Sequence, residues 1–472
     1  MKKLLTLTFL GATSAAAQQP NIVIIMTDQQ SHDMMSCAGN PYLRTPAMDR
    51  LAREGYRFEK TYAANPVSQP SRYALFTGHY ASDVGLRHNS KNKQECDASH
   101  AYDESCGMGY VFRRGGYDAV YAGKTHFYLG SGALGFKRIC SDAYDGPAAK
   151  AEEFFTSRKG NSKPYIAVFS FLNPHDICMA GGMTGRLDLP ELPDEQKVAT
   201  HRYLTMKDTL TQKEYHSQLP ASAANRTPIE GQIPQMSDLC LVAEEFSDDD
   251  WNFYSWLYHR LTESVDDQIG RVLAAMDKAG AWENTIVVFT SDHGEMNSSH
   301  GLCFKNVPFE ECQRVPLIFV GRDIPKGYRD SESLVCNGID LLPTLCDLAG
   351  IKAPEGLAGT SLRECLTQQK KLARDYIVTE TYNSFQIHDG RHKYTVFEVP
   401  DNPEMLTDIE ADPLELRNFA NSPAYASVRR ELRNKLAQNL RQRGLWPLRE
   451  DLALDTKKLR AKMLKDRQHI KR

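Results

Sequence analysis

The chain has 472 residues, of which 41% are hydrophobic and 25% are charged, and its formal net charge is −3. This composition is typical of a soluble globular protein, and the length indicates about two domains. The near-neutral charge does not point to nucleic acid or to an anionic membrane surface as a partner.

The first residues predict export. Lys2 and Lys3 precede a short, mostly apolar run at Leu4–Leu10, and small residues follow at Ala15–Ala17. This order is typical of a secretory signal peptide, so we expect residues 1–17 to be removed and the protein to reach the periplasm, or the medium, of a Gram-negative bacterium. No later run is long and apolar enough to predict a membrane span. The eleven cysteines are scattered singly without zinc spacing, and we expect most of them to be small buried residues.

Five short apolar runs predict buried strands. They are rich in β-branched residues and lack polar alternation, so both faces of each strand should be covered, as in a parallel sheet between helices. The five runs are Asn21–Met26, Ala119–Ala122, Tyr165–Phe171, Thr285–Phe289 and Val315–Val320.

Helical patterns lie between these runs. Apolar residues recur at helical spacing in Thr45–Glu54 and in Phe253–Met276. Strands that alternate with helices predict an α/β fold, so we expect residues 18–370 to form a domain in which helices sandwich a large mixed, mostly parallel sheet. The polar segment Ile177–Asp250 is predicted to be a long excursion from this domain, of the kind that shapes specificity.

The sequence pattern changes near Ser361–Asp375, where the alternation of apolar strands and helices ends. Strand-like pieces follow at Tyr376–Thr379 and Lys393–Glu398, and a polar helical tail closes the chain. We expect residues 371–472 to form a smaller α+β domain with a small antiparallel sheet. Its basic end, Lys457–Arg472, suits a solvated helix face or, alternatively, a contact with an acidic polymer.

Polar residues follow four of the predicted strands. In open parallel sheets ligands bind outside the carboxyl ends of the strands, so these residues should converge on one edge. Each cluster alone could be turn chemistry or a structural histidine, but four together favour a site. The clusters are Asp28-Gln29, Lys124-Thr125-His126, Asn173-Pro174-His175-Asp176 and Asp292-His293.

Two sets of side chains follow from these clusters. Asp28, Asp292 and the carbonyl oxygen of Gln29 are hard oxygen ligands. With His293 as a possible nitrogen ligand, this set suits Ca²⁺ better than zinc. The second set carries positive charge or hydrogen-bond donors, and together with a metal it makes a site for a compact oxyanion such as sulfate or phosphate. The second set is Arg72, Lys124, His126, His175 and Lys305.

The stretch NPVSQPSRYALFT predicts a short helix with polar residues at its start. Pro70 suits the first turn, either Ser68 or Ser71 suits the cap, and Gly78 suits the end. A capped helix alone would explain these residues. The helix dipole would, however, favour negative charge at Ser68. A plain serine is a weak nucleophile unless a base or metal activates it, and no G-x-S-x-G turn surrounds Ser68, so the residues leave its chemistry open.

These segments resemble the type I, formylglycine-dependent sulfatases of the alkaline phosphatase superfamily, in their serine form. The stretch SQPSRYALFTG matches the signature of that family. The resemblance covers nearly the whole mature chain, and the other segments follow in family order. They are NIVIIMTDQ, TPAMDRLAREGYRF, AGKTHF, NPHD, SVDDQIGRVL, TSDHG, IDLLPTLCDLAGI and LTDIEADPLELRN.

The resemblance implies that Ser68 is oxidised after translation to formylglycine. Serine in this position implies a radical, oxygen-independent maturase as a partner, which reads Pro70 and Arg72. One hydroxyl of the hydrated aldehyde would attack sulfur, and the other would drive the expulsion of sulfate.

The resemblance also implies roles for the converging residues. Lys124 and His126 would hold the nucleophile, and Arg72 would steady it. Lys305 and His175 would hold the sulfate, with His175 as proton donor to the leaving alcohol. One calcium ion would be bound by Asp28, Gln29, residue 68, Asp292 and His293.

Two features depart from the common family pattern. Many members carry Asp in place of Gln29 and Asn in place of His293, whereas a subset that includes choline-type and some glycosaminoglycan sulfatases carries the pair found here. The change removes one negative charge, which should weaken the metal site modestly. The excursion at Ile177–Asp250 has no evident match, so the resemblance does not carry a substrate to this chain.

We therefore expect an exported sulfatase that acts on a sulfated carbohydrate, such as a glycosaminoglycan or another host or algal glycan. Arg87 and His88, soon after the nucleophile helix, are candidates for contacts with the sugar, although exposed loop residues would look the same. One alternative is a phosphodiester or phosphonate monoester hydrolase of the same superfamily. Another is a non-catalytic protein that binds sulfated glycan with unmodified Ser68.

Overall fold

The computed structural model describes residues 18–89, 97, 102–127, 129–180, 203, 205–207, 209–210, 226, 229 and 246–452. The expected signal peptide, most of the excursion after Ile177 and the basic end of the chain lie outside these residues.

An eight-stranded sheet forms the centre of the molecule, with the strand order β4-β3-β5-β1-β6-β7-β2-β8. β1 pairs in parallel with β5 on one side and with β6 on the other. The strands are β1 (Asn21–Asp28), β2 (Tyr56–Tyr62), β3 (Asp118–Gly123), β4 (Lys137–Cys140), β5 (Tyr165–Pro174), β6 (Thr285–Ser291), β7 (Leu317–Val320) and β8 (Tyr328–Cys336).

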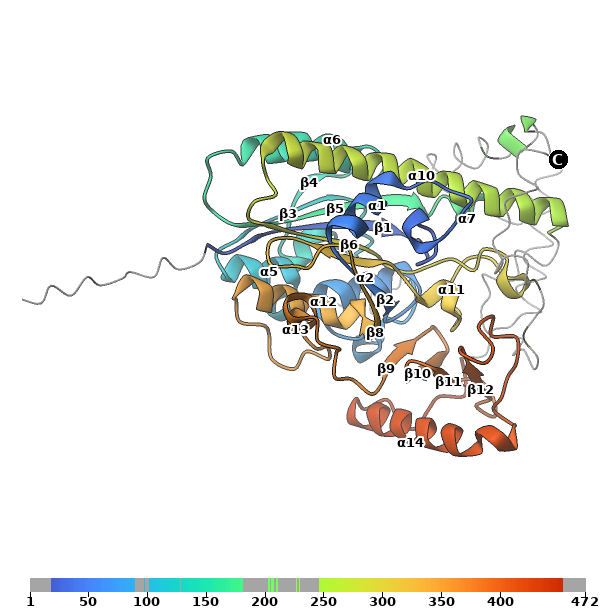
Figure 1. Ribbon diagram of the computed structural model, residues 1–472. Helices are drawn as coiled ribbons and strands as arrows, with labels where there is room; N and C mark the ends of the chain where they lie inside the picture. The colour runs from blue at the N-terminus through green and yellow to red at the C-terminus, as the bar shows by residue number, and fades with distance from the viewer. Residues whose placement is uncertain are drawn as a thin grey trace, which may run out of the picture.

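Helices cover both faces of this sheet (Figure 1). The helices of the described residues are α1 (Pro46–Glu54), α2 (Ser68–Thr77), α4 (Asp103–Cys106), α5 (Met108–Arg114), α6 (Gly146–Ser157), α7 (Ile177–Ala180), α10 (Asp248–Ala279), α11 (Glu310–Gln313), α12 (Asn337–Ala349), α13 (Arg363–Gln368) and α14 (Ala426–Gln442). α1, α6 and α10 pack against Val23 and Ile25 of β1, whereas α2, α5 and α12 pack on the opposite face, with Ile22 and Ile24. Because successive β1 side chains enter different cores, the strand has no polar alternation.

The predicted fold class is confirmed, but one strand runs against expectation. Four of the five predicted strands form β1, β3, β5 and β6, which are parallel. The fifth, Val315–Val320, forms β7, which is antiparallel to both β6 and β2. Both faces of β7 are buried whichever way it runs, so its composition does not give its direction.

The apolar pattern also does not predict β2, although this strand is buried. Arg57 and Glu59 of β2 form a buried ion pair of 2.7 Å, and in the sequence they look like surface residues. A buried strand that carries paired charges therefore escapes a search for apolar runs.

α2 begins at Ser68, but no serine side chain caps it, so the predicted cap is wrong. The N-cap is Val67, and the Ser71 hydroxyl instead donates to the backbone oxygen of Asp292 at 2.5 Å. α2 ends at Gly78, whose φ of 72° is the left-handed conformation expected for a glycine at a helix end.

A second sheet forms the C-terminal part of the protein (Figure 1). Its antiparallel strands are β9 (Ile377–Glu380), β10 (Ser384–His388), β11 (His392–Phe397) and β12 (Glu404–Asp408), in the order β12-β11-β10-β9. Leu432 and Leu436 of α14 pack on this sheet, and the same core includes Tyr62 and Ala74 from the large domain. The expected small antiparallel sheet is confirmed, whereas the domain boundary at residue 370 stays a prediction.

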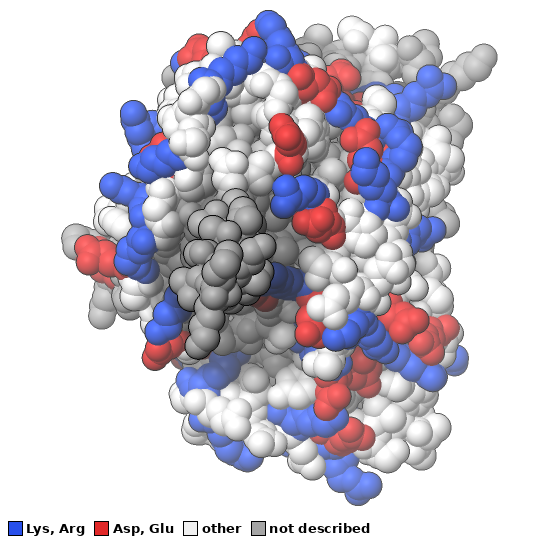
Figure 2. Space-filling model, turned by 60° about the vertical axis from the view of Figure 1, so that its left-hand side comes forward, with Lys and Arg blue, Asp and Glu red and all other residues white. Residues whose placement is uncertain are grey.

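Acidic and basic side chains are interspersed over the face seen in Figure 2. Six of the nine cysteines within the described residues are buried. Among the helices of the described part of the chain, none combines the length and the apolar character needed to cross a membrane.

Candidate active site at the carboxyl edge of the large sheet

The polar residues that follow β1, β3, β5 and β6 meet at the carboxyl edge of the large sheet. The carboxylate of Asp28, at the end of β1, lies 2.6 Å from Lys124 Nζ. It also lies 3.9 Å from His175 Nε2 and 4.0 Å from His293 Nε2. One side chain from each of three predicted clusters therefore lies around the carboxylate of the fourth.

Arg72 binds the carboxylates that end β1 and β6. Its Nη2 donates to Asp28 Oδ2 at 2.8 Å, and its Nε donates to Asp292 Oδ2 at 2.7 Å. Its Nη1 donates to the backbone oxygen of Lys124 and to Ser170 Oγ. Burial opposes the charge, but the two carboxylates hold the pKa of Arg72 above its usual value. Arg72 therefore fixes the relative position of the two aspartates.

Ser68 lies in contact with these groups. Its side chain is fully buried, and its Oγ lies 3.0 Å from His293 Nε2 and 3.5 Å from Asp28 Oδ1. Arg72 follows Ser68 by one turn of α2, so the helix places the hydroxyl and the guanidinium on the same side.

Asp28, Asp292 and His293 form a set of ligands that suits a divalent cation. One ligand atom from each residue lies within 4.8 Å of the other two, and all three side chains are buried. Nδ1 of His293 lies 2.9 Å from the Gly294 carbonyl oxygen, so Nδ1 carries the proton and the lone pair of Nε2 faces the carboxylates. Burial, and the neighbouring charge of Asp28, raise the pKa of Asp292 to about 7. A cation between the two carboxylates would offset both effects.

Lys124 and His126 line the site from the end of β3. Gly123 makes the turn possible: its φ is 92°, and a Cβ there would lie 1.9 Å from the Ser170 carbonyl oxygen. Burial lowers the pKa of Lys124, and the charge of Asp28 opposes that effect. Burial, with the charge of Lys124, lowers the pKa of His126 to about 3, so this imidazole is neutral.

His175 and Lys305 lie in the segments that follow β5 and β6. Nδ1 of His175 has no hydrogen-bond partner within the described residues. The Lys305 side chain is 4% exposed, and its ammonium donates to Gln29 Oε1 and lies 3.4 Å from Cys178 Sγ. Both residues therefore present nitrogen donors beside the carboxylate cluster.

Gln29 has a different set of contacts from those expected of a metal ligand. Its Nε2 donates to Glu295 Oε2 at 2.5 Å, and its Oε1 accepts from Lys305. Its backbone N–H donates to Asp292 Oδ1 at 3.1 Å. Its role at a metal stays a prediction.

Glu295 is not among the predicted site residues, yet it is fully buried and accepts a hydrogen bond from Gln29. Its place just after TSDHG is a weak signal, because an acidic residue in a loop is usually exposed.

Arg87 and His88 lie together at the junction with the C-terminal sheet. Arg87 donates to the Thr381 and Ser384 carbonyl oxygens, pairs with Glu398 and lies over the Phe385 ring. The His88 ring lies edge-on to Tyr382, with 5.1 Å between centroids. Both residues line a cavity of about 390 Å³. The contacts of Arg87 are those of a residue that holds the two parts of the protein together.

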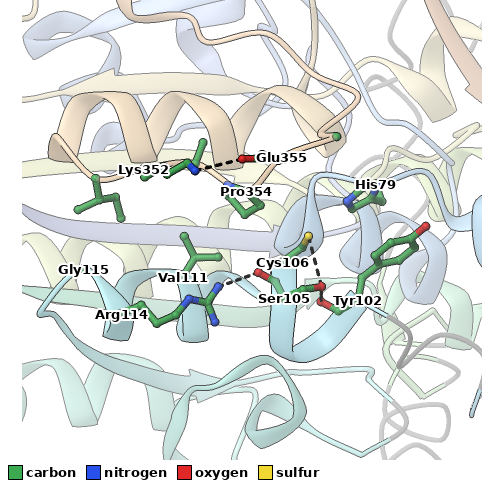
Figure 3. A pocket seen from close by; sticks show the side chains of 13 residues that line it. His79, Tyr102, Ser105, Cys106, Val111, Arg114, Gly115, Lys352, Pro354 and Glu355 are labelled. Atoms are coloured by element: carbon green, nitrogen blue, oxygen red, sulfur yellow. Dashed lines mark hydrogen bonds and ion pairs between the residues drawn. The ribbon is translucent and has the colours of Figure 1, made fainter.

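A larger cavity, of about 730 Å³, lies elsewhere in the molecule (Figure 3). Charged side chains on its wall are already engaged: Lys352 pairs with Glu355, and Arg114 donates to the Ser105 carbonyl oxygen. None of the residues that gather around Asp28 lines this cavity. The larger volume is therefore not the candidate active site.

The fold and the clustered site define a protein of the alkaline phosphatase-like class, with a mixed α/β architecture. The family model described as Sulfatase matches residues 20–351, and the one described as N-sulphoglucosamine sulphohydrolase, C-terminal, matches residues 298–442. The chain belongs to the sulfatase family and is a sulfuric ester hydrolase.

Individual relatives cover nearly the whole chain. A Delta 4,5-hexuronate-2-O-sulfatase of Bacteroides thetaiotaomicron is 30% identical over 460 residues, which cover 90% of each chain. An N-acetylglucosamine-6-O-sulfatase of the same species is 28% identical and covers 93% of this chain and 90% of its own. A solved structure described as a 2-O GAG sulfatase is 29% identical, with a TM-score of 0.74, and covers 90% of this chain and 93% of its own.

Proposed function

We propose that this sulfatase releases sulfate from a sulfated carbohydrate, with Ser68 oxidised to formylglycine and one calcium ion bound. The observation that carries the proposal is the contact of Ser68 Oγ with a cluster of Asp28, Asp292 and His293. Relatives named for hexuronate and N-acetylglucosamine sulfates support the carbohydrate class. Export and a serine-type maturase belong to the same proposal, and rest on residues 1–17 and on the SQPSR motif.

The calcium ion would be held by Asp28, Asp292 and His293, with Gln29 and residue 68 as further ligands. When bound, calcium and hydrated formylglycine supply an activated hydroxyl for attack on sulfur and a second hydroxyl that drives sulfate out. Arg72 holds the two carboxylates in place and balances part of their charge, so the ligand positions exist before the substrate arrives.

The nitrogen-containing side chains of the site would have two roles, one towards the nucleophile and one towards the sulfate group. Lys124 and His126 would hold the oxygen on residue 68, while Lys305 and His175 would bind the sulfate group. Burial and the charges of Lys124 and Lys305 hold the pKa of His175 well below its usual value. The negative charge of a sulfate ester would favour the protonated imidazole, which can then give its proton to the leaving alcohol.

Arg87 and His88 would contribute to recognition of the sugar. The support is their position on the 390 Å³ cavity, together with the hydrogen bond from the Gln69 backbone N–H to Asn89 Oδ1 at 2.9 Å, which ties this loop to the start of α2.

The test is sulfate release from a panel of defined sulfated sugars, covering hexosamine, galactose and uronate sulfates at each position, with choline sulfate included. The protein is coexpressed with a serine-type maturase, and the peptide around Ser68 is checked by mass for the loss of two hydrogens. Release from one regioisomer would support the proposal and name the substrate.

The alternatives give different results in the same experiment. A phosphodiester or phosphonate monoester hydrolase would turn over matched phosphoesters faster than sulfate esters. A non-catalytic glycan-binding protein would bind the sugars without release. Equal turnover by a Ser68→Ala variant would exclude formylglycine from either reaction.

A further inference from the structure

Glu295 is a buried carboxylate that the proposed chemistry does not use. Its Oε1 accepts from the Tyr254 hydroxyl at 2.8 Å, from Phe304 N at 2.6 Å and from Asn297 N at 3.2 Å. Its Oε2 accepts from Gln29 Nε2 at 2.5 Å. Because all four partners are donors, the group acts as an acceptor only, which is the property of a carboxylate.

These contacts fix the carboxylate from several directions. Tyr254 belongs to α10, and Phe304 and Asn297 belong to the loop that follows β6. Three donors hold Oε1, so the remaining oxygen, Oε2, is presented to Gln29 in a defined place.

Gln29 lies between Glu295 and Lys305. A side-chain amide has a donor end and an acceptor end, and only one orientation satisfies a carboxylate on one side and an ammonium on the other. Nε2 faces Glu295 and Oε1 faces Lys305, which is the satisfied orientation.

Lys305 has no carboxylate at ion-pair distance among the described residues; its direct partners are the amide oxygen of Gln29 and the thiol of Cys178. A direct ion pair would compete with an anionic ligand for the ammonium, whereas a neutral amide positions the ammonium and leaves its charge available.

We propose that Glu295 is a positioning residue: it orients the Gln29 amide so that its oxygen holds the Lys305 ammonium where the sulfate group binds. This inference rests on the proposed function of Lys305 as a sulfate-binding residue. Glu295 itself does not touch the substrate.

Glu295→Gln tests the inference, with the dissociation constant of inorganic sulfate and the KM as readouts. The new amide can keep its oxygen towards the three fixed donors, but its NH₂ then faces the NH₂ of Gln29, and the Gln29 amide must turn over. Loss of a hydrogen bond to a charged group predicts a dissociation constant and a KM raised by about 10-fold or more, with a much smaller change in kcat.

In the double variant Glu295→Gln with Gln29→Glu, the new amide at position 295 can donate to the new carboxylate at position 29. The hydrogen bond between the two positions is therefore restored in the reverse direction. The new carboxylate would also pair directly with the Lys305 ammonium, so the double variant should be more stable than Glu295→Gln without recovering sulfate affinity, whereas Gln29→Glu alone places two carboxylates against each other and should destabilise the protein. A role of Glu295 in packing alone predicts no such gain in stability.

Glu59→Gln is the matched control, because Glu59 is a buried, ion-paired glutamate on β2. It should lower stability and leave sulfate affinity unchanged. If Glu295→Gln does not fold, Tyr254→Phe removes one of the four donors with little change of shape, and it should weaken sulfate binding severalfold.

Unchanged sulfate affinity in the variant that folds, or a double variant no more stable than Glu295→Gln, would overturn the inference. Failure of the proposed function has a separate signature: the wild-type protein would then release no sulfate from any ester, while the affinity for inorganic sulfate would still follow the Glu295 variants.

Discussion

Two of the clusters of buried charge among the described residues differ in how completely their members are paired. At the junction between the C-terminal sheet and the large domain, the Lys393 ammonium lies 3.3 Å from Glu310 and 2.9 Å from Glu415. Glu415 also accepts from Thr407 Oγ1 at 2.8 Å, and Glu310 accepts from the Tyr62 hydroxyl at 3.2 Å. Each charged group of the junction cluster has protein partners.

The cluster around Asp28 is incomplete by comparison. Within the described residues, Nδ1 of His126 and Nδ1 of His175 lack hydrogen-bond partners. An unsatisfied buried polar group costs about 1–3 kcal/mol. Burial of charge alone therefore does not indicate a site, whereas the convergence of possible metal ligands with unpaired imidazole nitrogens does.

The largest expected effect is a loss of activity, without a loss of stability, when a residue of the cluster around Asp28 is changed. Ser68→Ala removes the proposed nucleophile, so sulfate release should fall by about 10⁴-fold or more, while the thermal midpoint should change little. Sulfate release measured by ion chromatography, with unfolding followed by fluorescence, gives both readouts. Activity equal to that of the wild type would remove Ser68 from the mechanism.

A change in the junction cluster of Lys393, Glu310 and Glu415 should lower stability and leave activity unchanged. Lys393→Met leaves Glu310 and Glu415 buried without their cation, and should lower the free energy of unfolding by about 3–5 kcal/mol. The kcat of the folded fraction should stay unchanged. Urea unfolding measures the first quantity, and the exposed Lys352→Met is the control that should change neither. A fall in kcat without loss of stability would mean that the junction takes part in catalysis.

Calcium should raise the free energy of unfolding through the cluster around Asp28 and not through the junction cluster. At a free calcium concentration of 100 times its dissociation constant, the gain in unfolding free energy should be about 2.7 kcal/mol. Chelation should abolish sulfate release, and calcium should restore it. Asp292→Asn should lose the calcium-dependent shift in thermal midpoint, whereas Lys393→Met should keep it. Identical midpoints of the wild type with and without calcium would contradict the metal assignment.

The smallest effect is a pH dependence of the junction. Burial opposes the charge of Lys393, but Glu415 and Glu310 raise its pKa above the usual value. The stability from this cluster is therefore fully present below the unfolded pKa of about 10.4 and is lost as the pH rises through the folded pKa. The difference in thermal midpoint between the wild type and Lys393→Met should shrink above about pH 10, as the Lys393 ammonium loses its proton. A difference that shrinks between about pH 7 and 9 would contradict this account.

The two clusters also differ in how well their contacts can be predicted from the sequence. The strands β1, β3, β5 and β6 are predictable because each is a continuous apolar run, and their order of polar endings brings Asp28, Lys124, His175 and Asp292 to one edge. The junction is not predictable, because Lys393, Glu310 and Glu415 come from three separate segments whose pairing depends on the packed fold.

Within the site, the loop after β6 limits the prediction. Residues Asn297, Ser298 and Phe304 have positive φ, so the path of this loop cannot be derived from helix or strand periodicity. The contacts of Lys305 and Glu295 with Gln29 depend on that path. Lys305 is predicted from the sequence as a member of the positively charged set, whereas Glu295 emerges only from the three-dimensional contacts.

The complete burial of Ser68 has a consequence for the order of events in the cell. Ser68, Pro70 and Arg72 are all buried in the folded protein, inside a helix packed between the sheet and α12. If Ser68 is oxidised as proposed, the oxidising enzyme would have to reach this segment in an extended, accessible form, before α2 docks. Maturation and folding would then compete for the same nascent chain, and a molecule that folded first would keep its serine until it unfolded again.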